Sequence, residues 1–264
     1  MIRNTFSILN GIGDKLERKL WSHGILTWKD FIGSDDMDFI SPARKRLMDE
    51  NLEAHLSRLA DGDAPWFKES LKSGDHWRLF EIFRDEAVCL DIETNGYQPE
   101  DGGYVTMVGL YDGYDYRSFV RDENLSAENL INALEPYKYL ITFYGSAFDV
   151  PFLRRSLRGF DVNIPHFDLC FGARKLGMKG GLKKLETEFG IERDLETQGM
   201  DGYDAVLLWH KVLKGSNEAR ELLVKYNRED TVNLWSISET IYGKLKESTG
   251  IDKYAKRGLV AALN

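Results

Sequence analysis

The spacing of apolar and polar residues divides the chain into a helical beginning and a longer part in which strands and helices alternate. In the longer part, the apolar run at residues 87–94 stops at Asn95 and Gly96, a pattern typical of a buried strand that ends in a turn. Strands are predicted at residues 87–94, 104–111, 116–120 and 139–144, and a helix at residues 217–246. Asp112 and Gly113 separate the second and third strands, which predicts a hairpin. The predicted fold class is α/β, with a mixed sheet flanked by helices.

Helical spacing also dominates the amino-terminal part, including residues 35–59. Two breaker-rich stretches follow at residues 60–65 and 73–75, and such stretches favour loops over regular elements. We therefore predict a small all-α domain at residues 1–62, a linker at residues 63–76 and an α/β domain at residues 77–264.

Two acidic residues lie on the first predicted strand. Asp91 and Glu93 are two positions apart, so their side chains point to the same face. Burying two carboxylates on an apolar strand is costly, because they repel one another and lose their hydration. A hard divalent cation such as Mg²⁺ or Mn²⁺ is the simplest compensation.

Two further acids and a tyrosine complete a candidate site. Asp149 follows the last predicted strand and precedes Pro151, which the first turn of a helix tolerates, so we expect Asp149 at a strand-to-helix junction near the first pair. Tyr226 and Asp230 are four positions apart in the long predicted helix, which places them on one helical face. The alternative is a set of solvated surface carboxylates, which the apolar surroundings of the motifs disfavour.

The order and spacing of these residues resemble the DEDD exonuclease group, in the branch whose last motif is Tyr-x-x-x-Asp, and within it the ribonuclease H-like proteins of the YprB type. The resemblance spans residues 77–245 and includes three further segments, at residues 103–110, 166–169 and 181–186. It implies a ribonuclease H-like fold and two divalent metal ions, Mg²⁺ or Mn²⁺, as cofactors. It also implies 3′ to 5′ exonuclease activity, with single-stranded DNA as the favoured substrate.

The same resemblance implies a role for each candidate residue. Asp91 would bridge two metal ions roughly 4 Å apart, Glu93 and Asp230 would complete the ion site that activates water, and Asp149 would act on the second ion through coordinated water. Tyr226 would orient the attacking water, because a phenol with a pKa near 10 is largely protonated at neutral pH. Supporting roles are expected for Thr94, His166 and Asp168.

One position departs from the related sequences. Tyr144 precedes Gly145 and the Phe148-Asp149 pair, where the family usually carries Asn before the glycine. The missing amide bears on how the scissile phosphate or the terminal nucleotide is held. It leaves the predicted metal ligands in place.

The amino-terminal part contains a second resemblance, to the helix-hairpin-helix module. Gly11 and Gly13 permit a tight turn and leave backbone amides open at the start of the next helix, where a phosphate oxygen can bind. Lys15, Arg18 and Lys19 would add nonspecific attraction to a nucleic-acid strand. Modules of this type mostly bind the DNA backbone, which favours DNA over RNA as the partner. The alternative is a glycine turn that only packs two helices together.

Composition and charge change this interpretation little. The net charge of −8 argues against a generally basic surface, but a local basic groove is compatible with it. Cys89 and Cys170 provide neither a disulfide framework nor zinc-ligand spacing, so we expect a reducing, cytoplasmic location. No apolar stretch supports a membrane span, and the first residues lack the hydrophobic region of a signal peptide.

Two alternatives to a DNA exonuclease stay open on the sequence. Within the enzyme class, the substrate would be RNA. Outside it, the chain would be a DNA-binding or scaffold module whose nuclease site is vestigial, although all four acids and the tyrosine are present.

Overall fold

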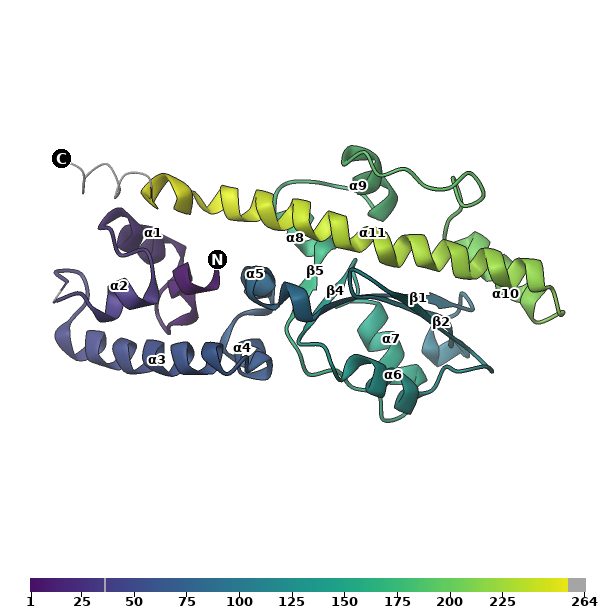
Figure 1. The fold of residues 1–264 in the computed structure, drawn as a ribbon, viewed down its shortest axis with the longest axis horizontal. Helices are drawn as coiled ribbons and strands as arrows, with labels where there is room; N and C mark the ends of the chain where they lie inside the picture. The colour runs from purple at the N-terminus through teal and green to yellow at the C-terminus, as the bar shows by residue number, and fades with distance from the viewer. Residues whose placement is uncertain (36, 256–264) are drawn as a thin grey trace.

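The computed structural model describes residues 1–35 and 37–255, and Figure 1 shows its fold. Its five-stranded sheet has the strand order β3-β2-β1-β4-β5. The strands are β1 (Ala87–Thr94), β2 (Val105–Tyr111), β3 (Tyr116–Val120), β4 (Tyr139–Thr142) and β5 (His166–Asp168). β2 pairs antiparallel with both β1 and β3, whereas β4 pairs parallel with both β1 and β5. The predicted mixed sheet and its hairpin are confirmed.

Helices cover both faces of the sheet (Figure 1). The 33-residue helix α11 crosses one face, and α6 and α7 pack against the other. The helices of this part are α5 (Phe80–Phe83), α6 (Ala127–Leu134), α7 (Asp149–Ser156), α8 (Leu169–Lys175), α9 (Leu182–Glu188), α10 (Gly202–Val212) and α11 (Asn217–Thr249), with 3-10 segments at Ser73–Leu79, Arg84–Glu86 and Pro99–Asp101. None of the helices in the described ranges is both long and apolar enough to cross a membrane.

Alternation along β1 decides which layer each side chain faces. Ala87 and Cys89 belong to the core shared with α11, while Val88 and Leu90 belong to the core shared with α6 and α7. Because successive side chains on a strand point to opposite faces, the odd-numbered positions that follow also point toward α11. The apolar beginning of β1 therefore directs its two acids to the α11 side.

A close approach between α11 and the sheet occurs at Gly109 of β2, which pairs with Asp91. A Cβ atom at Gly109 would lie 2.2 Å from Asn227 Oδ1 and 2.4 Å from Thr231 Oγ1. Any side chain there would push the helix away, so the lack of one lets α11 bring its polar residues over β1.

The amino-terminal part is helical, as predicted. Its helices are α1 (Asp14–Ser22), α2 (Trp28–Ile32), α3 (Pro42–Ala60) and α4 (Ala64–Ser70), preceded by 3-10 segments at Ile2–Asn4 and Phe6–Ile8. Its apolar residues share one core with the sheet, and this core includes Trp28, Phe67 and Phe167. A buried ion pair, in which Arg78 Nη1 donates to Glu17 Oε1 at 2.9 Å, also joins the two parts. The amino-terminal helices are therefore packed against the rest of the molecule.

The structure refines the predicted organisation of this part. The helix predicted across residues 35–59 begins only at Pro42, whose fixed backbone dihedral suits the first turn of a helix. The predicted linker at residues 63–76 contains α4 and the start of a 3-10 segment. The domain boundaries themselves stay a prediction, and residues 36 and 256–264, which fall within the predicted domains, lie outside the described residues.

Candidate active site

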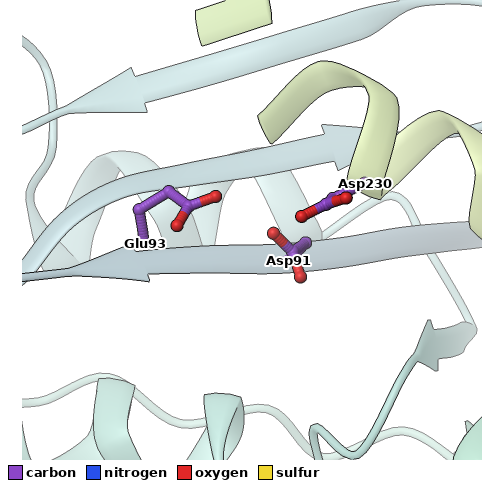
Figure 2. Close-up of side chains that lie close together, drawn as sticks. All are labelled: Asp91, Glu93 and Asp230. Atoms are coloured by element: carbon purple, nitrogen blue, oxygen red, sulfur yellow. The ribbon is translucent and has the colours of Figure 1, made fainter. Parts of the chain in front are cut away.

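A cluster of three carboxylates lies between β1 and α11. Asp91 and Glu93 come from the strand, Asp230 comes from the helix, and one oxygen of each lies within 4.8 Å of the others. Figure 2 shows the three side chains gathered in the space between the two elements. The structure thus brings together three of the four acids predicted as metal ligands.

Asn227 contacts the two carboxylates of this cluster that come from β1. Its Nδ2 atom donates to Asp91 Oδ2 at 2.9 Å and lies 3.5 Å from Glu93 Oε1. Its Oδ1 atom accepts a hydrogen bond from the Tyr116 hydroxyl at 2.9 Å. Sequence reasoning gave Asn227 no role, although it lies inside the Tyr-x-x-x-Asp motif.

Asp149 begins α7, as predicted from the strand-to-helix junction. Its Oδ1 atom accepts the backbone N–H of Ile92 at 3.2 Å, so its carboxyl touches β1 between the two acids of that strand. Burial raises the pKa of Asp149 to about 7, and the Asp149 charge contributes to the raised pKa values of Asp91 and Glu93. The fourth acid therefore lies beside the three-carboxylate cluster and interacts with it.

Burial and mutual repulsion make this cluster unfavourable on its own. Burial is the largest cause of the raised pKa values of Asp91 and Glu93, and the charge of Asp230 is the next. Burial also raises the pKa of Asp230, against the opposing effect of the nearby Arg193. Several carboxylate oxygens in so small a space are the donor set that hard divalent cations prefer. The residues present therefore fit the metal ions expected for this fold.

Tyr226 is buried one helical turn before Asp230. Lys183 Nζ donates to the Tyr226 hydroxyl at 3.2 Å and lies 5.1 Å from the centre of the ring. Burial, followed by the charges of Asp230 and the strand acids, raises the pKa of Tyr226 above its ordinary value. The phenol is therefore protonated at neutral pH and can donate a hydrogen bond.

Arg193 is a site residue that sequence reasoning missed altogether. Its guanidinium contacts Asp230 and forms a two-pronged pair with Glu186, at 2.8 and 2.7 Å. Its Nη1 atom is buried and has no hydrogen-bond partner among the described residues. Arg193 lies between α9 and α10 with no recognisable motif around it. The sequence did contain one indication of this contact. Its partner, Glu186, is the last residue of the family segment at residues 181–186.

Asp168 holds the loop that leads to α7. Its carboxylate accepts hydrogen bonds from the Tyr144 amide at 2.9 Å, the Ser146 amide at 3.0 Å and the Ser146 hydroxyl at 2.6 Å. It also accepts the amide of Cys170 at 3.1 Å. Asp168 therefore orders the backbone that positions Asp149 and does not join the carboxylate cluster.

The other two predicted supporting residues also contact the structure around the site. His166 Nε2 lies 2.7 Å from Thr142 Oγ1, and burial lowers the pKa of His166 to about 4, so its ring is neutral at pH 7. Thr94 Oγ1 accepts the backbone N–H of Gly96 at 3.2 Å, in the turn that follows β1. Both side chains are thus engaged in local hydrogen bonds.

The residues predicted to bind DNA lie in the amino-terminal part, away from the carboxylate cluster. Gly11 has a φ of +76°, Gly13 precedes the first residue of α1, and Arg44 Nη2 donates to the Gly11 carbonyl at 2.8 Å. The side chains of the predicted contact residues are exposed, at Lys15, Arg18 and Lys19. Figure 1 shows α1 beside the last part of α11. Since α11 rises about 1.5 Å per residue, its last turn lies about 28 Å along the helix from Asp230.

Comparison with known proteins identifies the fold of this site. Residues 88–242 match the RNase H superfamily. The chain belongs to this superfamily. No curated protein matches the chain. The superfamily match covers β1 through most of α11, and therefore includes every residue of the candidate active site.

Two solved structures are similar in outline. One is a nuclease in its apo form, with 19% sequence identity and a TM-score of 0.46, covering 74% of this chain and 90% of that one. The other is NrnC of Brucella melitensis bound to pGG, with 17% identity and a TM-score of 0.45, covering 70% of this chain and 89% of that one.

Proposed function

We propose that this RNase H superfamily protein is a metal-dependent exonuclease that hydrolyses phosphodiester bonds at the 3′ end of single-stranded nucleic acid, with DNA favoured over RNA. The observation that carries the proposal is the convergence of Asp91, Glu93 and Asp230 within 4.8 Å, with Asp149 beside them. The direction of cleavage follows from the resemblance to the DEDD group. The preference for DNA follows from the helix-hairpin-helix resemblance.

The four acids would hold two divalent ions, Mg²⁺ or Mn²⁺. When bound, such ions supply a hydroxide-like nucleophile at neutral pH and neutralise charge on the phosphate and the leaving oxygen. Asn227 keeps the Asp91 carboxylate in place through its 2.9 Å hydrogen bond. The position of Asp149 is set by its contact with the backbone of β1.

Other side chains would handle the substrate and the water. The protonated Tyr226 is suited to orient a water molecule next to Asp230, one turn away on the same helix. Lys183 and Arg193 place positive charge beside the acids, where the scissile phosphate would bind. The chain thereby offers both the anionic groups that bind metal and the cationic groups that bind phosphate.

The proposed activity is tested by a time course on 5′-labelled single-stranded DNA and RNA of one sequence, with Mn²⁺ or Mg²⁺. We expect a stepwise ladder, and Asp91→Asn should lower the rate by about a thousandfold, because it removes a shared metal ligand. The matched control is Asp101→Asn, an exposed acid outside the site. The ratio of the DNA and RNA rates determines the sugar preference.

The same assay distinguishes an exonuclease from the main alternative function, a binding or scaffold module. If both substrates stay intact with either metal while DNA is still retarded on a gel, the chain is a binding or scaffold module with a vestigial site. A ladder that persists unchanged in Asp91→Asn would mean that hydrolysis takes place elsewhere or in a contaminant.

We further propose that the amino-terminal module binds the DNA backbone through the amides at the start of α1 and through Lys15, Arg18 and Lys19. Replacing these three cations by Gln should reduce the slope of log affinity against log salt by about 2 to 3, equally for all DNA sequences. The control replaces two exposed lysines of another surface, Lys211 and Lys214, by Gln. An unchanged slope in the triple variant would leave the module a purely structural role.

A further inference from the structure

Exposed aromatic rings gather next to the candidate active site. Tyr144 is 43% exposed, Phe171 is 40% exposed and Phe148 is 37% exposed. The rings of Tyr144 and Phe171 lie 6.0 Å apart between centroids, with their planes inclined by 34°. Exposed aromatic rings that lie together are typical of binding surfaces.

Arg174 adds a planar positive charge to these rings. Its guanidinium carbon lies 5.6 Å from the centre of the Tyr144 ring and 5.2 Å from that of Phe171. Within the described part of the chain, its guanidinium forms no ion pair and donates no side-chain hydrogen bond. An arginine that is stacked on aromatic rings, with its donors free, suits a planar or anionic ligand.

Tyr144 adopts a backbone conformation that its side chain disfavours. Its φ of +66° is in the left-handed region, which glycine and asparagine enter more easily than a bulky aromatic residue. The Asp168 carboxylate, which accepts the Tyr144 amide, helps to keep this conformation. An aromatic residue held against its backbone preference indicates that the ring itself has a use.

These rings are adjacent to the predicted metal ligand Asp149. The Tyr144 carbonyl accepts the amide of Phe148 at 3.0 Å, which forms one tight turn directly before Asp149. α8 brings Phe171 and Arg174 to the same loop. Tyr144 and Asp149 therefore belong to one short segment, which connects the aromatic rings to the carboxylate site.

A cavity lies next to Phe171 and Arg174. It has a volume of about 940 Å³, and Phe171 and Arg174 form part of its lining. Three more basic side chains line it, namely Lys68, Arg154 and Lys175. Arg154 pairs with Asp161 at 2.6 Å and Lys175 pairs with Asp75 at 3.2 Å, so the chain itself already compensates these two charges. Among the described residues, Lys68 and Arg174 form no ion pair, and their charges suit a phosphate group.

We propose that Tyr144, Phe171 and Arg174 form a stacking platform for an unpaired base of a single-stranded nucleic acid whose end lies at the carboxylate cluster. The identity of the ligand as a substrate rests on the proposed function. Stacking uses the face of a base and ignores the sugar, so the platform selects single strands over duplexes and accepts both DNA and RNA. Substrate choice at this point is then governed by strandedness.

Binding of short oligonucleotides to the full-length protein tests this platform. The probes are labelled single-stranded pentamers, one intact and five with a single abasic position each, and anisotropy is recorded in EDTA so that metal-dependent cleavage stops. For the wild-type chain, we expect one abasic position to weaken binding by about tenfold, the range that loss of one stacked base produces.

The variants are Tyr144→Asn, Phe171→Ala and Arg174→Gln. Each should weaken binding of the intact pentamer, and Tyr144→Asn should lose little further affinity when the sensitive base is also removed, because both changes delete the same contact. Asparagine tolerates the left-handed backbone at this position, so this variant keeps the fold even if another does not. Tyr203→Ala, which removes a 68% exposed ring from α10, should bind like the wild type.

The outcomes separate this inference from the proposed function. If the variants bind the pentamers like the wild type, or if the effects of Tyr144→Asn and base removal multiply, the platform is wrong even when the protein hydrolyses DNA with Mn²⁺. If the abasic series shows the expected dependence on Tyr144 but no hydrolysis occurs with either metal, the platform stands and the nuclease proposal fails.

Discussion

Two aspartate side chains in this molecule are equally buried but differ in their hydrogen-bond partners. Asp168 and Asp230 are each 8% exposed. Asp168 accepts four hydrogen bonds, from two loop amides, one hydroxyl and the amide of Cys170. Asp230 lies beside the carboxylates of Asp91 and Glu93 and contacts a single cation, Arg193.

This difference shows how burial can serve either structure or function. A carboxylate that obtains its donors from nearby backbone is compensated within the fold, and its charge orders that backbone. A group of carboxylates that repel one another is compensated only in part by the chain, and therefore favours an external cation. Burial alone does not separate the two cases, whereas the count of donors does.

The largest effect on stability is expected at the structural carboxylate. Asp168→Asn replaces one acceptor oxygen by an amide NH2 group, a donor that would face the donors of the Tyr144 to Ser146 loop. We expect a loss of about 3 kcal/mol in the free energy of unfolding, measured by urea denaturation in EDTA. The exposed Asp101→Asn serves as the control and should change stability by less than about 0.5 kcal/mol.

Equal stability of Asp168→Asn and the wild-type protein would show that the loop finds other acceptors. Asp168 would then not be a structural carboxylate. A stable Asp168→Asn variant with reduced nuclease activity would instead place Asp168 in the chemistry.

Much of the carboxylate site was predictable from the sequence, because its residues lie on regular elements. Alternation along a strand placed Asp91 and Glu93 on one face, and helical spacing placed Tyr226 one turn from Asp230. These local rules also predicted the mixed sheet. They did not predict which strand face α11 would cover, which depends on the close approach at Gly109.

The contacts that sequence reasoning missed are tertiary. Arg193 is 37 positions from Asp230, and Lys183 is 43 positions from Tyr226, so no local period connects them. Arg174 meets Tyr144 only because α8 packs beside the loop that precedes α7. The helix expected to begin near residue 35 begins at Pro42, since helical spacing by itself does not define where a helix starts.

A smaller effect of opposite sign is expected at the carboxylate cluster. Asp91→Asn keeps an acceptor for the Asn227 amide but removes one of the repelling charges, so it should raise the free energy of unfolding in EDTA by about 1 kcal/mol. Saturating Mn²⁺ should reverse the order of the two proteins. The ions bind the folded wild-type site, and a metal concentration a hundredfold above Kd adds about 2.7 kcal/mol to its stability.

The crossing of the two stabilities is the decisive feature of this experiment, and it is measured by urea denaturation of both proteins with and without Mn²⁺. Asp101→Asn should follow the wild type in both buffers, because it leaves the cluster untouched. If Asp91→Asn is less stable than the wild type in EDTA, the cluster contributes to the fold as Asp168 does. Its buried carboxylates would then need an explanation other than the binding of a cation.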